Sequence, residues 1–97
     1  MEIKKTGMAG TLESSDLQVT VSPASAKGIT FELTSDVKKQ FGEQIQATVL
    51  DVLNKYGIQN AAVQIVDKGA LDLVIRARAA AAVERALEAE EINWEAL

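Results

Sequence analysis

The spacing of apolar residues changes its period near residue 36, and this change constrains the fold more than any other feature of the chain. Before it, apolar and polar residues alternate in segments 17–21 and 29–33, as in strands that bury one face. After it, apolar residues from Val37 to Tyr56 recur at steps of three and four, which predicts an amphipathic helix. The chain is therefore predicted to combine a sheet with helices.

The carboxyl-terminal half repeats this pattern. Residues 62–66 are a third predicted strand, Asp67-Lys68-Gly69 supplies a turn, and residues 71–87 return to helical spacing. The first helix is expected to end at Gly57 in the left-handed conformation, with Ile58 as its apolar contact.

Each predicted helix has an expected buried face and an expected exposed face. The residues expected against the sheet in the first helix are Val37, Phe41, Ile45, Val49, Val52, Leu53 and Tyr56. In the second helix, Arg76, Glu84 and Glu88 are expected to face solvent.

The order strand, strand, helix, strand, helix predicts the α+β class. We expect a small antiparallel or mixed three-stranded sheet with both helices packed on one face. The first two strands should be antiparallel, and the third should be parallel to the second. With 97 residues the chain can bury about one hydrophobic core, so residues 1–97 are predicted to form a single domain.

The composition limits the possible chemistry, because the sequence contains neither histidine nor cysteine. The commonest general base, the commonest transition-metal ligand and every thiolate nucleophile are thus absent. No catalytic residue and no metal ligand is predicted. Asp67 and Asp72 bracket the predicted turn, but capping is favoured over an acid/base pair.

The charge and hydropathy exclude two further classes of partner. A net charge of −4 argues against binding to a nucleic-acid backbone, which requires clustered lysine and arginine. No apolar run approaches the about 20 residues that span a bilayer, and none follows Lys4 and Lys5 as in a secretory signal. We therefore expect a cytoplasmic protein with no nucleic-acid or membrane partner.

The segment 9–16, Ala-Gly-Thr-Leu-Glu-Ser-Ser-Asp, is unusual for its two adjacent hydroxyls immediately before the first predicted strand. Small polar residues at this position predict exposure to solvent. The residue types alone favour a plain serine or aspartate turn that starts the strand.

This segment resembles the attachment segment of the citrate lyase acyl carrier (gamma) subunit family. The resemblance continues in the same order through Gln40-Phe41-Gly42, Asp67-Lys68-Gly69-Ala70-Leu71 and Arg76-Ala77-Arg78, and covers about residues 9–94. It implies that Ser14 carries a phosphoribosyl-dephospho-CoA group through a phosphodiester bond. Ser15 stands at a position that is serine or glycine in the family, and it is the less favoured attachment residue.

The resemblance also implies a role and a set of partners. The arm would hold acetyl as a thioester, the alpha subunit would exchange acetyl for citrate, and the beta subunit would cleave the citryl thioester to oxaloacetate and acetyl carrier. A prosthetic-group synthase and an acetylating ligase would load the arm. A chain without cysteine fits this role, because the thiol belongs to the arm. We further hypothesise that Glu13 and Asp16 repel the phosphodiester and keep the arm off the protein surface.

Three other interpretations stay open. The carrier subunit of malonate decarboxylase resembles this family and uses the same type of prosthetic group on serine. An unmodified interaction or regulatory module has an equally compatible composition, whereas an enzyme is disfavoured by the missing histidine and cysteine.

The tail that contains Trp94 is expected to pack on its own domain, with docking on a larger subunit as the alternative.

Overall fold

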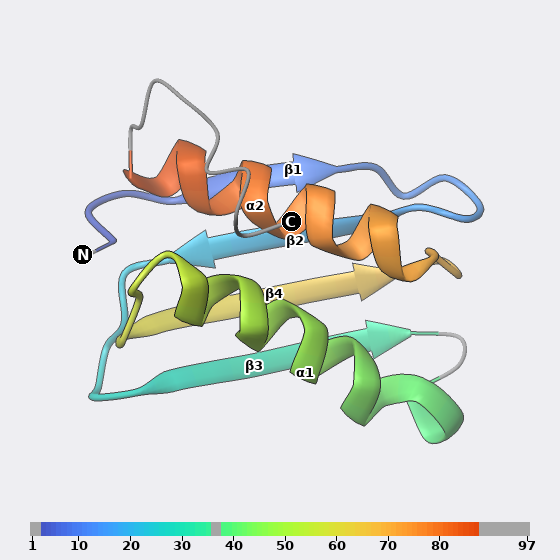
Figure 1. Ribbon diagram of the computed structural model, residues 1–97, viewed down its shortest axis with the longest axis horizontal. Coiled ribbons are helices and arrows are strands. Elements are labelled where there is room, and N and C mark those ends of the chain that lie inside the picture. Colours follow the sequence, from blue (N-terminus) through green and yellow to red (C-terminus); the bar gives the residue numbers. More distant parts are fainter. Residues whose placement is uncertain (1–2, 36–37, 88–97) are drawn as a thin grey trace.

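The computed structural model describes residues 3–35 and 38–87 (Figure 1). Its elements are β1 (Gly7–Gly10), β2 (Leu17–Ser22), β3 (Ile29–Ser35), α1 (Lys38–Lys55), β4 (Ala61–Asp67) and α2 (Asp72–Leu87). The strands form one four-stranded sheet in the order β1-β2-β4-β3. Strand β2 is antiparallel to both of its neighbours, and β4 is parallel to β3.

The α+β class, both helices and the parallel pairing of the last strand are confirmed. The predicted number of three strands is wrong, because β1 precedes the segments that alternate. The strands β2 and β3 are antiparallel in direction, as expected, but they are not neighbours, since β4 lies between them.

Strand β1 escapes sequence analysis because its inward positions carry the small residues Gly7 and Ala9, while Met8 between them is exposed. A Cβ atom on Gly7 would overlap the carbonyl oxygen of Ala82 and the amide nitrogen of Ala86 in α2. Helix α2 thus lies against the backbone of β1, and the strand buries its inner face without large apolar side chains.

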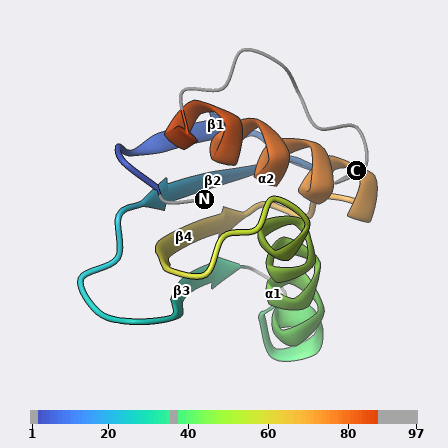
Figure 2. The same cartoon turned by 60° about the vertical axis from the view of Figure 1, so that its left-hand side comes forward.

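Both helices cover the same face of the sheet (Figure 2). Helix α2 packs on β1 and β2, α1 packs on β3, and the two helices contact each other. The core between these layers contains side chains that are almost completely buried: Leu17, Val19, Val21, Val49, Val52, Leu53, Val63, Ile65 and Val83. Each such side chain contributes about 1.5–3 kcal/mol relative to an exposed one, so this layer stabilises the fold.

The end of α1 matches its prediction. Gly57 has a φ of 74°, its N–H donates to the Asn54 carbonyl oxygen at 3.0 Å, and the N–H of Ile58 donates to the Leu53 carbonyl oxygen at 3.0 Å. These two bonds form a Schellman motif, and the burial of Ile58 supplies its apolar contact. The helix therefore ends where a left-handed residue and a buried side chain coincide.

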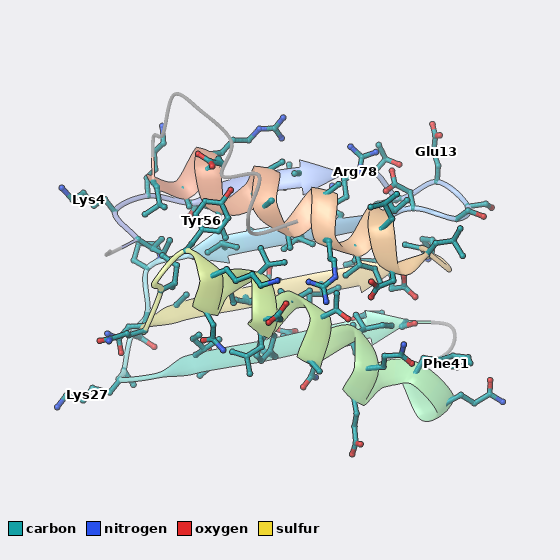
Figure 3. The ribbon with its side chains drawn as sticks, in the orientation of Figure 1. Lys4, Glu13, Lys27, Phe41, Tyr56 and Arg78 are labelled. Carbon is teal, nitrogen blue, oxygen red and sulfur yellow. The ribbon has the colours of Figure 1, made fainter. Side chains whose placement is uncertain are left out.

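The predicted exposure of two helix residues is wrong. Phe41 was expected in the core but is 49% exposed, because it lies in the first turn of α1 at a corner of the molecule (Figure 3). Glu84 was expected in solvent but is buried, and its Oε1 accepts a hydrogen bond of 2.6 Å from the Tyr56 hydroxyl. Val37, Glu88 and Trp94 lie outside the described residues.

Two of the described connections lie at the same end of the sheet. The register pairs Leu17 and Ser35 with Asp67, so β2 begins where β3 and β4 end. The β1–β2 connection leaves from this end, as does the turn between β4 and α2 (Figure 1). Within residues 3–35 and 38–87, no helix is both long and apolar enough to cross a membrane.

Candidate functional site

The connection between β1 and β2 contains residues 11–16, here named the serine loop. Residues 11–15 are exposed, as predicted, and Asp16 is partly buried. The N–H of Asp16 donates to the Glu13 carbonyl oxygen at 3.2 Å, which closes a turn with Ser14 and Ser15 at its centre. The hydroxyl-bearing Ser14 therefore stands at the exposed tip of a defined turn.

Ser15 has a φ of 65°, which is unusual for a residue other than glycine. A positive φ at the second central position of a turn is the geometry of a type II turn, which favours glycine or asparagine there. Glycine would adopt this conformation more easily than serine does, because it has no Cβ atom.

The carboxylate of Asp16 organises the base of the serine loop. Nε and Nη2 of Arg78 donate to Oδ1 and Oδ2 of Asp16 at 3.0 and 2.9 Å. The Thr11 hydroxyl donates to Oδ2 at 2.6 Å, and the N–H of Leu17 donates to Oδ1 at 2.7 Å. Such paired arginine–carboxylate bonds are directional as well as charged, so they fix the orientation of the loop on α2.

These contacts also fix the charge of Asp16, whose side chain is only 13% exposed. The Arg78 guanidinium, followed by the Thr11 hydroxyl, holds the pKa of the Asp16 carboxyl well below its usual range. The charge of Asp16 is paired with Arg78, which weakens the expected repulsion of the arm, and this part of the hypothesis stays a prediction. Glu13 is exposed and extends away from the helices (Figure 3), so its part of the hypothesis stays a prediction.

The backbone of Lys68 binds the other side of the serine loop. The N–H of Ser15 donates to the Lys68 carbonyl oxygen at 2.8 Å, and the N–H of Lys68 donates to the Asp16 carbonyl oxygen at 2.9 Å. Two bonds to one residue's backbone join the serine loop to the β4–α2 turn. Ser14 is thus positioned by both α2 and the sheet.

The β4–α2 turn is itself ordered by Asp67. Its buried carboxylate accepts hydrogen bonds from the N–H of Ala70 at 3.0 Å and from the Ser35 hydroxyl at 2.9 Å. Asp72 opens α2 and accepts bonds from the Thr48 hydroxyl at 3.0 Å and from Arg76 Nε at 3.1 Å. Asp67 thus accepts from a backbone N–H of the turn, as the capping interpretation expects, whereas the bonds of Asp72 come from two side chains.

A groove next to this turn was not predicted from the sequence. It has a volume of about 390 Å³ and lies between α1 and the start of α2. Its apolar walls are Phe41, Ile45, Ala70, Leu71 and Ile75, and its polar groups include Thr48 and Asp72. Leu71 is 75% exposed there, although its position in the helical pattern suggested burial.

Arg78 is the functional candidate that sequence reasoning missed. It occurs in the Arg76-Ala77-Arg78 segment of the family resemblance, but the sequence analysis predicted no function for that segment. Its partner Asp16 is 62 residues away in the chain, and only the folded structure brings the two together. No group of three or more acidic side chains in the described part of the chain is arranged to hold a metal ion.

In chemical terms, the site offers a primary hydroxyl at an exposed tip, on a loop held from two sides. This arrangement suits covalent attachment of a group by an external enzyme. The family model of the malonate decarboxylase delta subunit (MdcD), an acyl carrier protein family, matches residues 4–86. The chain therefore belongs to an acyl carrier protein family.

Curated relatives identify the particular carrier. Over the full length of both chains, the sequence is 64% identical to the citrate lyase acyl carrier protein of Lactococcus lactis subsp. lactis and 61% identical to that of Weissella paramesenteroides. It is 50% identical to that of Streptococcus mutans, over 97% of this chain and 92% of the relative. The chain belongs to the citrate lyase acyl carrier protein family.

Solved structures share the fold at low sequence identity. A homoserine kinase from Cytophaga hutchinsonii matches 94% of this chain with a TM-score of 0.63 and 11% identity, and this chain spans 38% of the kinase. A protein from Thermus thermophilus matches 90% of this chain with a TM-score of 0.53 and 15% identity, and this chain spans 16% of it. These likenesses concern the architecture alone.

Proposed function

We propose that this protein is the acyl carrier subunit of a citrate lyase complex, and that Ser14 carries a phosphoribosyl-dephospho-CoA arm through a phosphodiester bond. One observation carries the proposal: Ser14 stands at the exposed tip of a turn that Arg78 and Lys68 hold in place. The arm would supply the thiol on which acyl groups travel as thioesters. A chain with no cysteine needs such an imported thiol and cannot compete for the acyl group.

The protein's own residues hold and present the attachment point. Asp16 and Arg78 fix the serine loop to α2, and the Lys68 backbone fixes it to the sheet. An arm that starts from a fixed point samples a limited volume, and tethering over such distances gives effective concentrations near millimolar. The carrier would thereby serve the alpha and beta subunits in turn during cleavage of citrate to acetate and oxaloacetate.

The geometry of the turn favours Ser14 over Ser15 as the attachment residue. The backbone of Ser15 is constrained twice, by its left-handed conformation and by its bond to Lys68. Glycine adopts the left-handed conformation more easily than serine and donates the same backbone N–H, so this position requires no hydroxyl. Ser14 has an exposed side chain and an ordinary backbone conformation.

The carrier subunit of malonate decarboxylase is a second candidate, because the matching family model is described by a subunit of that enzyme. Citrate lyase is favoured because relatives at 50–64% identity have that name. An unmodified interaction module, the third interpretation, predicts that Ser14 stays bare. For the carrier we propose a cytoplasmic location.

The test is the intact mass and peptide map of the chain produced together with its prosthetic-group synthase. We expect one phosphoribosyl-dephospho-CoA adduct on Ser14 and none on Ser14→Ala. The matched control is Ser15→Gly, which removes the neighbouring hydroxyl but retains the left-handed turn, and it should be modified as fully as the wild type. An unmodified wild-type chain, or an adduct lost in Ser15→Gly, would contradict the proposal.

Restoration of enzyme activity with purified partner subunits distinguishes the two carrier candidates. A citrate lyase carrier should restore citrate cleavage when its acetylated form is added to those subunits. Restoration of malonate decarboxylation instead, with the corresponding subunits of that enzyme, would identify the second candidate.

A further inference from the structure

The groove between α1 and the start of α2 is directly joined to the attachment point. Its rim includes Gly69 and Ala70, which follow Lys68 in the chain. Lys68 in turn exchanges two backbone hydrogen bonds with Ser15 and Asp16 in the serine loop. Since consecutive Cα atoms are about 3.8 Å apart, the rim lies only a few residue lengths from the loop.

The lining of the groove matches a small, mostly apolar ligand with amide groups. Its volume of about 390 Å³ falls in the range typical of small-molecule sites. Phe41 and Leu71 offer apolar surface from α1 and from the start of α2, and both are exposed. The carboxylate of Asp72 is 56% exposed and can accept hydrogen bonds from amide N–H groups.

The exposure of Leu71 is not explained by the fold. Leu71 and Leu73 are 75% and 73% exposed at the start of α2, while the buried face of the same helix begins at Ile75. Leu71 lines the groove and Leu73 does not. Substituting Leu71 and Leu73 separately therefore distinguishes an effect of the groove from a general effect of exposed apolar side chains.

We propose that this groove binds the pantetheine-like thiol end of the arm when the carrier is not engaged with a partner subunit. The inference rests on the proposed function, because the ligand is the arm attached to Ser14. Tethering favours this occupant over a free ligand, since an attached group is present at about millimolar effective concentration. Even weak contacts with Phe41 and Leu71 would then keep the groove occupied.

The absence of cysteine makes this proposal measurable. A disulfide reagent added to the holo protein can react only with the thiol of the arm. A groove occupied nine tenths of the time would slow that reaction by about tenfold relative to free pantetheine. We expect the reaction of the wild-type holo protein to be slowed by several fold.

Two uncharged variants and one control complete the experiment. Phe41→Ser and Leu71→Ser should raise the reaction rate toward that of free pantetheine, whereas Leu73→Ser should leave the wild-type rate unchanged. In the wild type, amide NMR shifts should differ between the unmodified and holo forms at Ala70 and Leu71. Because these readouts do not depend on citrate cleavage, they report on docking alone.

The outcomes separate this inference from the proposed function. A chain with no reactive thiol and no added mass would overturn the function itself. A thiol that reacts as fast as free pantetheine in every variant would overturn docking and leave the function standing. A fully reactive thiol combined with weaker binding of Leu71→Ser to the alpha or beta subunit would also overturn docking and assign the groove to a protein partner.

Discussion

The forces that hold together the layer between the helices and the sheet differ from those that order the serine loop. In the layer, Leu53 and its neighbours are completely buried and contribute by leaving water. In the serine loop, the side chains of residues 11–15 are exposed, and order comes from hydrogen bonds to Asp16 and Lys68 and from the ion pair with Arg78. The difference teaches that folding and the presentation of Ser14 are controlled by separate residues.

The two regions meet at Leu17. Leu17 is completely buried, yet its N–H donates to the carboxylate of Asp16 at 2.7 Å. The serine loop is therefore anchored on a residue that the core already immobilises. A change within the core should mainly reduce stability and leave Ser14 in place, whereas a change in the serine loop should mainly move Ser14 at a small cost in stability.

The largest effect on stability is expected from Leu53→Ala, which tests the core side of this comparison. Removing a fully buried leucine side chain leaves a cavity and should reduce the free energy of unfolding by about 2–5 kcal/mol. Chemical denaturation measures this loss. At temperatures where the variant is still folded, its rate of modification at Ser14 should equal that of the wild type, and a parallel loss of both properties would break the comparison.

A smaller effect on stability but a clear effect on modification is expected from Arg78→Gln. The variant loses both bonds to Asp16 and frees the serine loop from α2. Because misplacement of a reacting group by about 1 Å can cost 100-fold in rate, we expect modification of Ser14 to slow by roughly tenfold or more. Time-resolved intact mass with the prosthetic-group synthase gives the rate.

Arg76→Gln is the matched control for that variant. Arg76 lies on the same helix and also bridges carboxylates, Asp51 at 2.7 Å and Asp72 at 3.1 Å, but it does not contact the serine loop. The two variants should lower the melting temperature to a similar extent, while only Arg78→Gln slows modification. Equal slowing in both would mean that the ion pair acts through general stability.

The smallest effect is the dependence of this ion pair on pH. Arg78 and Thr11 lower the pKa of Asp16 in the folded state, so the pair stabilises the protein fully above the unfolded-state pKa near 3.9. This contribution is lost as the pH falls below that value toward the folded-state pKa. The difference in melting temperature between wild type and Asp16→Asn should be constant from about pH 8 to pH 5 and shrink below about pH 4. A difference that grows in acid would contradict the assigned pairing.

The sequence indicated most of the fold because periodic burial is a local property. The positions of both helices, the strands that alternate and the left-handed Gly57 follow from patterns within a few residues. The exposure of Ser14 followed from the small polar residues around it. These features need no knowledge of which segments meet in space.

Several features that could not be predicted depend on contacts between distant segments. The burial of Glu84 depends on the hydroxyl of Tyr56, which follows the end of α1, and the role of Asp16 depends on Arg78. Strand β1 depends on the close approach of α2. The backbone of this helix fills the space that a side chain at Gly7 would occupy. Periodicity describes one element at a time, so it carries no information about such pairs.

The start of β1 lies at the end of the sheet opposite the serine loop, since Gly7 pairs with Val21 while Gly10 pairs with Gln18. Lys4 and Lys27 mark this far end in Figure 3, well away from Glu13. A fluorophore, bead or fusion partner joined ahead of β1 would therefore point away from Ser14. The protein can be immobilised by its amino-terminal side with Ser14 directed into solution, where an added enzyme can reach it repeatedly.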